Sequence, residues 1–188
     1  IWALRLGSYL FLRILKDRED RRFKEWKTSF PLFLRTWTMQ GMWVFLTSVS
    51  GITAICSRDI IDPGAYFYIG CVLWVFGFLF ESISDYQKRN FKVQNPDSFI
   101  SSGLWSLSRH PNYFGEIVLW LGITIIALPV LQGYQYFSLI SPIFVFWLLT
   151  KVSGIQILER HADQTWGNQE DYKKYKDSTP VLFPKFFK

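Results

Sequence analysis

The sequence has few of the residues on which thiol and metal chemistry depends. Its 188 residues include two cysteines, Cys56 and Cys71, and two histidines, His110 and His161. The cysteines lie in or beside apolar runs and form no CxxC pair, so they support neither a disulfide framework nor a thiol-based metal site. Two histidines are too few for a histidine-rich di-iron membrane oxygenase, and there is no HExxH zinc helix. The sequence predicts no metal centre, although it leaves open a haem held between His110 and His161.

The loops with which many soluble enzymes hold a phosphate or a nucleophile are also missing. The sequence contains no GxSxG nucleophile elbow, no Walker motif and no GxGxxG loop. It has no internal repeat and no low-complexity tract. These absences set aside the chemistries that depend on these motifs.

Large apolar side chains, by contrast, are abundant. The chain is 49% hydrophobic and contains nine Trp and eighteen Phe, which a soluble domain of this length would have difficulty burying. The charged residues are concentrated outside the apolar runs, a pattern typical of a multi-pass membrane protein. Because the sequence opens on Ile1, with neither Met nor a signal-like region, we expect it to be processed or to begin partway through a longer protein.

Four apolar runs are long enough to predict membrane-spanning helices. They cover about residues 37–56, 65–80, 114–130 and 136–150, with polar or turn-forming segments between them. The apolar residues 1–15 precede them, as either the end of a membrane helix or an amphipathic helix at the interface. The predicted fold class is an all-α, multi-pass membrane helix bundle with about four full spans plus an N-terminal apolar helix.

We expect a single membrane domain in three parts. Residues 1–36 form an N-terminal apolar helix and a charged segment, residues 37–150 form the four-span core with a polar loop at 81–113, and residues 151–188 form a polar tail.

The tail itself is predicted to hold two short helices. Gln156 to Trp166 has the pattern of a helix closed by Gly167. Asn168 is then placed to cap a second helix, with Asp171 in its first turn.

The distribution of positive charge predicts the topology. With four spans, the amino end, the 81–113 segment and the tail share one side, and 19 of the 21 Lys and Arg residues lie there. The opposite loops hold only Arg58. This bias identifies the basic side as cytoplasmic, or its organellar equivalent, and does not distinguish endoplasmic reticulum, another organelle or a bacterial inner membrane. It also explains the net charge of +6 without a nucleic-acid partner.

The stretch from Gly103 to Glu116, GLWSLSRHPNYFGE, is the most distinctive polar sequence. Pro111 marks a helix start, so Arg109 and His110 precede the positive end of a helix at the edge of an apolar segment. Such a site can bind a phosphate or a carboxylate. The alternative is a loop that caps a membrane helix, with Arg109 extended to the membrane surface.

Further polar residues of the 81–113 segment and the tail are expected to converge with this stretch. Glu81, Asp85 and Lys88 share one helix face. Together with the tail residues they could bind a nucleotide, with cations on phosphates and carboxylates on sugar hydroxyls. The alternative is that these groups satisfy one another at a wet interface.

Glu116 stands a turn or so inside a predicted membrane helix. A carboxylate there is costly unless it is paired or lines a polar cavity. Arg109 and His110 are its nearest predicted partners, and its role is either a structural clamp or a catalytic acid.

The sequence of Gly103–Glu116 resembles the signature motif of the steroid 5-alpha-reductase-like membrane proteins. These proteins belong to the steroid reductase C-terminal-domain class. Asp85-Tyr-Gln-Lys88, Trp166-Gly167 and Thr179-Pro180 fit the same pattern. The similarity extends over nearly the whole chain. Sterol reductases share the motif, and isoprenylcysteine carboxyl methyltransferases carry a related Arg-His-Pro element.

This resemblance implies a helical bundle whose polar segments bind NADPH at the cytosolic face, and reduction of a carbon–carbon double bond conjugated to a ketone. Burial at the membrane face would keep water from the nicotinamide. By this resemblance the predicted cofactor-binding set is Arg5, Glu81, Asp85, Lys92, Arg109, His110, Asn112, Tyr113, Glu116, Glu159 and Tyr172.

Two departures concern catalysis. The tyrosine of the reductases falls at or near Trp2, and their glutamate belongs to helices upstream of Ile1, so the catalytic residues are unassigned.

The first hypothesis is an NADPH-dependent membrane reductase of a lipid or steroid-like enone. The second is a non-catalytic, reductase-derived subunit of a larger membrane complex that retains a nucleotide or lipid site. The third is a methyltransferase that uses S-adenosylmethionine. The expected partners are membrane lipids, a lipid-like substrate or other membrane subunits.

Overall fold

The computed structural model describes residues 1–17, 29–59 and 63–186, and all regular secondary structure in these ranges is helical. The chain forms two compact units, Ile1–Phe45 and Leu46–Lys188, where the sequence predicts one domain. The boundary between the units, after Phe45, lies inside the helix Phe30–Ile55, which is apolar on both sides of it, so hydropathy gives no sign of the division. None of the side chains of residues 29–45 is buried, whereas Ser50 is fully buried.

The first unit contains α1 (Trp2–Asp17) and the first part of α2 (Phe30–Ile55). Many of its large apolar side chains, such as those of Leu4, Phe11 and Phe30, are exposed. Most of the charged segment predicted after the apolar helix lies outside the described residues.

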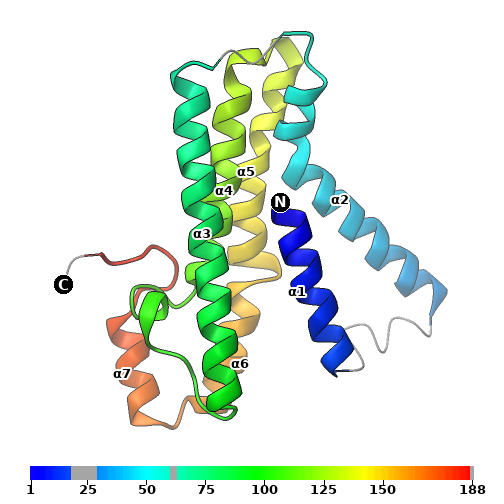
Figure 1. Cartoon of the computed structure of the whole chain (residues 1–188). Helices are drawn as coiled ribbons and strands as arrows, with labels where there is room; N and C mark the ends of the chain where they lie inside the picture. The colour runs from blue at the N-terminus through cyan, green and yellow to red at the C-terminus, as the bar shows by residue number, and fades with distance from the viewer. Residues whose placement is uncertain (18–28, 60–62, 187–188) are drawn as a thin grey trace. The chain divides into compact units, whose positions relative to one another are not determined.

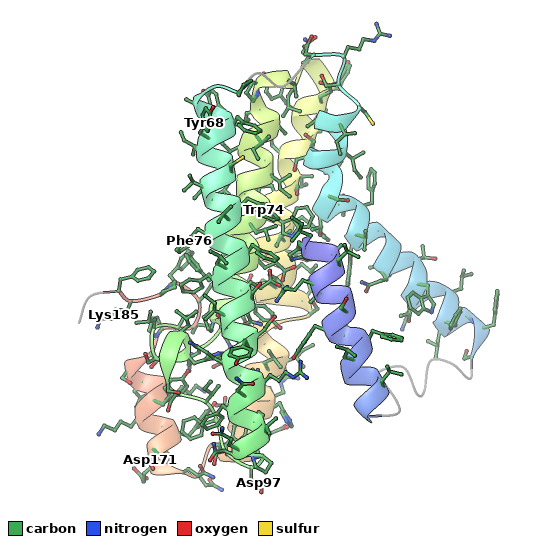
Figure 2. The ribbon with its side chains drawn as sticks, in the orientation of Figure 1. Tyr68, Trp74, Phe76, Asp97, Asp171 and Lys185 are labelled. Atoms are coloured by element: carbon green, nitrogen blue, oxygen red, sulfur yellow. The ribbon has the colours of Figure 1, made fainter. Side chains whose placement is uncertain are left out.

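The second unit contains the remaining helices. In chain order they are α3 (Ala65–Gln94), η3 (Gly103–Ser106), α4 (Pro111–Ala127), η4 (Leu128–Val130), η5 (Gly133–Leu139), α5 (Ile140–Trp147), η6 (Leu148–Val152), α6 (Ile155–Trp166) and α7 (Glu170–Ser178). Helices α3, α4 and α5 lie side by side, and α6 and α7 lie at one end of this unit (Figure 1). Figure 2 places Asp97 and Asp171 at that end and Tyr68 at the opposite one. The two polar segments of the second unit therefore meet at one end.

Helices α3 and α4 approach each other through glycines. A Cβ atom added to Gly77 would lie 2.5 Å from the carbonyl oxygen of Gly115, and one added to Gly70 would lie 2.6 Å from that of Gly122. The two glycines of each helix are seven residues apart, so they lie on the same face two turns apart. Small residues of this kind let two helix backbones come close, as in the helix interfaces of membrane proteins.

Within the residues that the structure describes, three apolar helical stretches are long enough to cross a membrane: Ala65–Gln94, Pro111–Val130 and Gly133–Trp166. They indicate a membrane protein. Helix α2 corresponds to the first predicted span and is not among the three, because Gln40 and several Ser and Thr residues lower its mean hydropathy. The count of four spans and the type of membrane remain predictions.

The polar segment that begins at Glu81 differs from the predicted loop. Helix α3 continues without a break to Gln94 and ends before Pro96. No Gly or Pro occurs between Gly77 and Asn95, so the change from apolar to polar residues does not interrupt the backbone hydrogen bonds. Only the part after α3 forms a loop, and η3 lies within it.

The tail largely follows its prediction. Helix α6 ends at Trp166 with Gly167 at its C-cap, as expected. The prediction that Asn168 caps the next helix is wrong, because Gln169 occupies that position and α7 starts at Glu170. Asn168 lies instead in the turn that follows α6. In this turn the Gln169 amide donates to the Trp166 carbonyl at 2.9 Å.

Candidate functional site

A cavity of about 240 Å³ lies between the polar half of α3, the segment before α4, and helices α6 and α7. We call it the basic cavity. Its lining comprises Lys88, Lys92, Phe99, Ile100, Trp105, Arg109, His110, Leu158, Glu159, His161, Ala162, Trp166, Tyr172 and Tyr175. The two polar segments that the sequence predicts to converge both contribute to this wall.

Glu159 connects the two segments. Its Oε2 atom is 3.2 Å from Nη1 of Arg109, and its Oε1 atom is 2.8 Å from Nε2 of His110. The Arg109 side chain is only 10% exposed and that of Glu159 only 20%. A single carboxylate from α6 therefore forms an ion pair with Arg109 and a hydrogen bond with His110, in partly buried surroundings that strengthen both interactions.

Burial lowers the pKa of His110, although the hydrogen bond to Glu159 opposes this shift. The ring is therefore neutral at pH 7. Because a carboxylate only accepts hydrogen bonds, the proton of neutral His110 is assigned to Nε2, which donates to Glu159. This tautomer leaves a lone pair on Nδ1, a buried atom without a hydrogen-bond partner. The His110 ring also stacks on Tyr113 at a centroid distance of 5.6 Å.

The loop that carries these residues is anchored to α3. Gly103 has a φ of 62°, a conformation that favours glycine, and a Cβ atom there would lie 2.6 Å from the Gln87 side chain. Gln87 in turn accepts a hydrogen bond from the Leu104 amide at 2.9 Å. The buried Trp105 donates from Nε1 to the carbonyl of Ser84 at 3.0 Å.

The C-terminal segment holds the other side of the same loop. The Arg109 amide donates to the Pro180 carbonyl at 2.9 Å, and the fully buried Ser108 hydroxyl donates to the Leu182 carbonyl at 2.8 Å. The Lys185 amide donates to the Leu107 carbonyl at 3.0 Å. These hydrogen bonds fix the backbone at Arg109, whose side chain lines the cavity.

Aromatic rings form part of the cavity wall. The Phe99 ring lies within 6.0 Å of the Trp166 ring, 5.3 Å of the Tyr172 ring and 5.6 Å of the Tyr175 ring, between centroids. Such clusters are stabilised by offset and edge-to-face contacts. They also present flat apolar surfaces to the cavity.

Both tyrosines remain protonated at neutral pH. Burial raises the pKa of Tyr172, whose hydroxyl donates to Asp163 at 3.0 Å. Burial likewise raises the pKa of Tyr175, whose hydroxyl donates to the Trp105 carbonyl at 2.7 Å. Each hydroxyl therefore acts as a donor that links α7 to a neighbouring segment.

The lining carries an excess of positive charge. Lys88 lies over the Trp105 ring at 4.7 Å, and Lys92 lies over the Trp166 ring at 4.8 Å. With Arg109, these lysines make three cations against the carboxylate of Glu159, a formal charge of +2 among the lining residues. A cavity with this charge and these rings is suited to an anionic ligand that has a flat ring.

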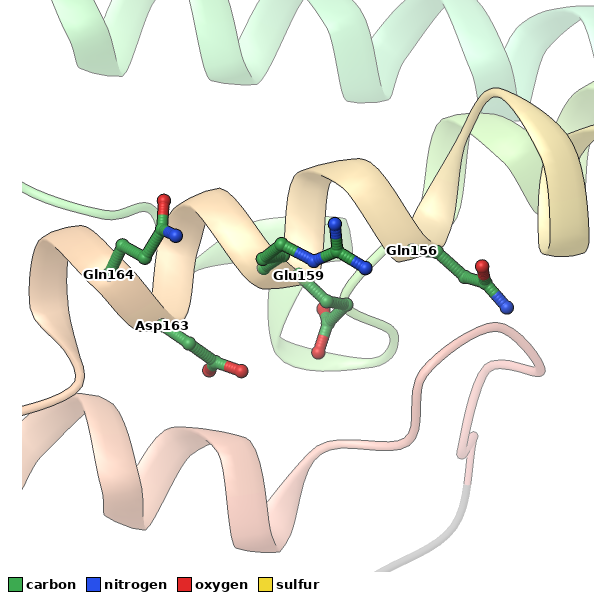
Figure 3. Close-up of a pocket in the computed structure, with 5 residues that line it drawn as sticks. Gln156, Glu159, Asp163 and Gln164 are labelled. Atoms are coloured by element: carbon green, nitrogen blue, oxygen red, sulfur yellow. The ribbon is translucent and has the colours of Figure 1, made fainter.

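Next to the cavity, an open depression of about 650 Å³ lies along α6. Gln156, Glu159, Arg160, Asp163 and Gln164 line it, and Figure 3 shows Glu159 and Asp163 pointing toward α7 and the C-terminal segment. Glu159 belongs to both lining sets. Asp163 is paired with Lys176, whose Nζ is 2.5 Å away.

Comparison with known families identifies the family of the chain. The model of a family described as a protein of unknown function, DUF1295, matches residues 1–179. The chain belongs to the DUF1295 family. This is a family of the steroid 5-alpha-reductase-like kind, which agrees at that level with the resemblance in the sequence. Neither a curated protein nor a solved structure is significantly similar to the chain.

In this DUF1295 member, five residues of the predicted cofactor set line the basic cavity. They are Lys92, Arg109, His110, Glu159 and Tyr172. Three of them, Arg109, His110 and Glu159, contact one another directly.

The other six predicted residues lie outside the lining. Arg5 belongs to the first unit. Glu81 is 3% exposed on α3, against the glycine face of α4, where a Cβ atom at Gly115 would meet its backbone nitrogen. Also outside the lining are Asp85, Asn112, Tyr113 and Glu116. The carboxylate that pairs with Arg109 and His110 is that of Glu159, whereas the sequence predicts Glu116.

The predicted set omits several lining residues. Phe99, Ile100, Leu158 and Ala162 have apolar side chains, so neither charge nor hydrogen-bonding capacity marked them as part of a polar site, and Trp105 lies in the Gly103–Glu116 stretch but is not in the predicted set. Lys88, His161 and Tyr175 are polar residues of the predicted converging segments, and Trp166 ends the predicted tail helix. Their positions depend on the packing of α6 and α7 against α3.

Proposed function

We propose that the chain is a membrane-embedded, NADPH-dependent reductase of a lipid or steroid-like enone, within the steroid 5-alpha-reductase-like group. The observation that carries this proposal is the basic cavity, where Lys88, Lys92 and Arg109 meet aromatic rings from three segments. Membership of the DUF1295 family is consistent with it. The alternative that these polar groups only satisfy one another is less favourable, because the lining retains an excess charge of +2.

The donor set fits a dinucleotide phosphate. The Arg109 Nε atom is buried and has no hydrogen-bond partner, and the same holds for His110 Nδ1. An unpartnered buried donor costs about 1–3 kcal/mol, which a ligand oxygen would recover. A phosphate could accept from Arg109, while a ribose hydroxyl or carboxamide could donate to His110 Nδ1.

Within this proposal, Lys88, Lys92 and Arg109 bind phosphate oxygens, and the rings of Trp105 and Trp166 pack against a base or the nicotinamide. NADPH supplies a hydride when bound. The aromatic wall would exclude water from that ring.

The cavity volume limits how much of the cofactor it encloses. About 240 Å³ is below the roughly 300–1,000 Å³ of most small-molecule pockets. One end of NADPH would therefore lie inside the cavity. The remainder would extend over the open depression on α6, where Gln156, Arg160 and Gln164 offer hydrogen bonds.

A second candidate is a non-catalytic subunit that retains the nucleotide site. The observation that favours it is Trp2, which stands at or near the position of the reductase tyrosine. An indole N–H is a hydrogen-bond donor but does not supply a proton as a phenol can.

NADPH titration of the purified protein in detergent tests the proposal through tryptophan fluorescence, because Trp105 and Trp166 line the cavity. We expect quenching on NADPH addition. Arg109→Ala should weaken binding about 10- to 100-fold, the range for losing a hydrogen bond to a charged group. Arg58→Ala is the matched control, since it removes an exposed arginine from the loop after α2.

The outcomes separate the candidates. No response to NADPH contradicts the nucleotide site, and a response to S-adenosylmethionine in its place supports the methyltransferase. NADPH binding without oxidation by any enone, together with co-purification of other membrane subunits in fixed ratio, supports the subunit.

A further inference from the structure

A second hollow lies away from the basic cavity, between the last turns of α2 and η5. We call it the uncharged groove. It measures about 510 Å³ and is lined by Leu46, Val49, Thr53, Tyr134, Gln135, Phe137, Ser138 and Ile140. Helix α4 separates η5 from the segment that holds Arg109, so the groove lies at the opposite end of the second unit (Figure 1).

The lining restricts the chemistry of an occupant. None of its eight residues is charged, so the groove offers no counter-ion for a phosphate, carboxylate or ammonium group. Burying such a group there without a partner would be strongly unfavourable. The exposed rings of Tyr134 and Phe137 stack on each other beside it, at a centroid distance of 6.4 Å. Aromatic side chains of this kind are enriched where a protein meets the membrane interface.

One buried polar atom in this wall has no hydrogen-bond partner. Ser138 is 4% exposed, and its Oγ is buried without a hydrogen bond. Two other polar side chains of the lining are engaged: the Thr53 hydroxyl donates to the Val49 carbonyl at 2.8 Å, and Gln135 Oε1 accepts from the Gln132 amide at 2.9 Å.

Ser138 differs in this from the four other serines that are buried as whole residues; Ser82, a half-buried residue on α3 far from the groove, is the other described serine whose Oγ is buried without a partner. Ser50, Ser84, Ser108 and Ser141 all have hydrogen-bond partners. A hydroxyl without one destabilises the folded protein, and more so beside lipid, where water cannot compensate. Its presence in an apolar groove is explained if a ligand supplies the missing oxygen.

We infer that the uncharged groove binds a neutral lipid whose apolar body carries one hydrogen-bonding oxygen, such as a long-chain alcohol. The apolar wall holds the hydrocarbon, and the lipid oxygen bonds to the Ser138 hydroxyl. This site is separate from the basic cavity and goes beyond the proposed reductase activity.

Thermal unfolding of the purified protein in detergent tests this inference, with oleyl alcohol, octadecene and oleate as probes. We expect oleyl alcohol to raise the melting temperature most. Octadecene lacks the oxygen, and oleate carries a charge that the groove cannot pair. Ser138→Ala should weaken oleyl alcohol binding about 3- to 10-fold, the value of one hydrogen bond. Val49→Trp should fill the groove and abolish the effect of every probe.

Stability without ligand distinguishes a binding role from a structural one. Ser138→Ala removes an unpaired hydroxyl, so the free protein should melt at the same or a higher temperature. Ser141→Ala is the matched control: its hydroxyl donates to the Thr47 carbonyl, and its loss should lower the melting temperature. Equal effects of octadecene and oleyl alcohol, or an undiminished alcohol effect in Ser138→Ala, would overturn the inference. The NADPH response of Ser138→Ala should be unchanged, which separates this test from that of the proposed function.

Discussion

Replacing Glu159 with Gln should change stability and anion binding in opposite directions. The substitution keeps the shape of the side chain but removes the charge that lies 3.2 Å from Arg109 Nη1 and 2.8 Å from His110 Nε2. Gln can still accept one hydrogen bond from His110. The loss therefore amounts to one ion pair and the charge assistance of the second contact.

The expected stability change follows from the burial of the pair. A hydrogen bond to a charged group contributes about 1.5–3 kcal/mol, and truncating a deeply buried pair costs about 3–5 kcal/mol. Because Glu159 is 20% exposed and Arg109 10% exposed, solvent screens part of this interaction. We expect a loss of about 2 kcal/mol, or roughly 4–8 °C in melting temperature for a chain of this size.

Anion binding should improve in the same variant. Removing Glu159 raises the formal charge of the cavity lining from +2 to +3 and frees Arg109 to face the ligand. NADPH, or inorganic pyrophosphate as a simpler probe, should bind several-fold more tightly.

The matched control is Glu170→Gln on α7, which changes the same charge at a side chain that is 90% exposed. Its stability should stay within about 0.5 kcal/mol of the parent protein. If Glu159→Gln lowers both stability and anion affinity, Glu159 holds Arg109 in its binding position, and the argument from cavity charge is wrong.

Two further predictions concern packing and pH. Gly77→Ala should destabilise the protein by about 1–3 kcal/mol through overpacking against Gly115. Gly41→Ala, whose added Cβ meets nothing within 4 Å, should instead stabilise α2 by up to about 1 kcal/mol; equal shifts in melting temperature would contradict this packing. Because burial lowers the pKa of His110, the unfolded chain binds that proton first, so stability should fall as pH decreases below about 6.5. His110→Gln should reduce this dependence in melting curves from pH 7.5 to 5, and an undiminished dependence in that variant would contradict the role given to His110.

The sequence predicts well what depends on neighbours along the chain. Pro111 at the start of α4 and Gly167 at the end of α6 act through local backbone geometry, and both appear where expected. The end of α3 was harder to predict, because the break in composition at Glu81 is not a break in the backbone. Hydropathy indicates whether a segment lies in lipid or in water. A helix ends only where its backbone hydrogen bonds stop, which for α3 is after Gln94.

The local sequence does not reveal which carboxylate pairs with Arg109. Glu116 is the nearest carboxylate along the chain, but Glu159 pairs with Arg109 because α6 packs alongside the segment before α4. The aromatic wall depends on the same packing, since Phe99 meets Tyr172 and Tyr175 only when α7 lies against it.

The sequence by itself determined the helical, membrane-type character of the chain and the motif that places a basic site before Pro111. These follow from composition and from the conformations of single residues. The tertiary structure decided which charges are neutralised, that the buried Ser138 hydroxyl in the uncharged groove has no partner, and which rings enclose the cavity. Those properties are set by contacts between residues far apart in the chain, and it is the close approach of α3 to α4 and the docking of α6 and α7 that create them.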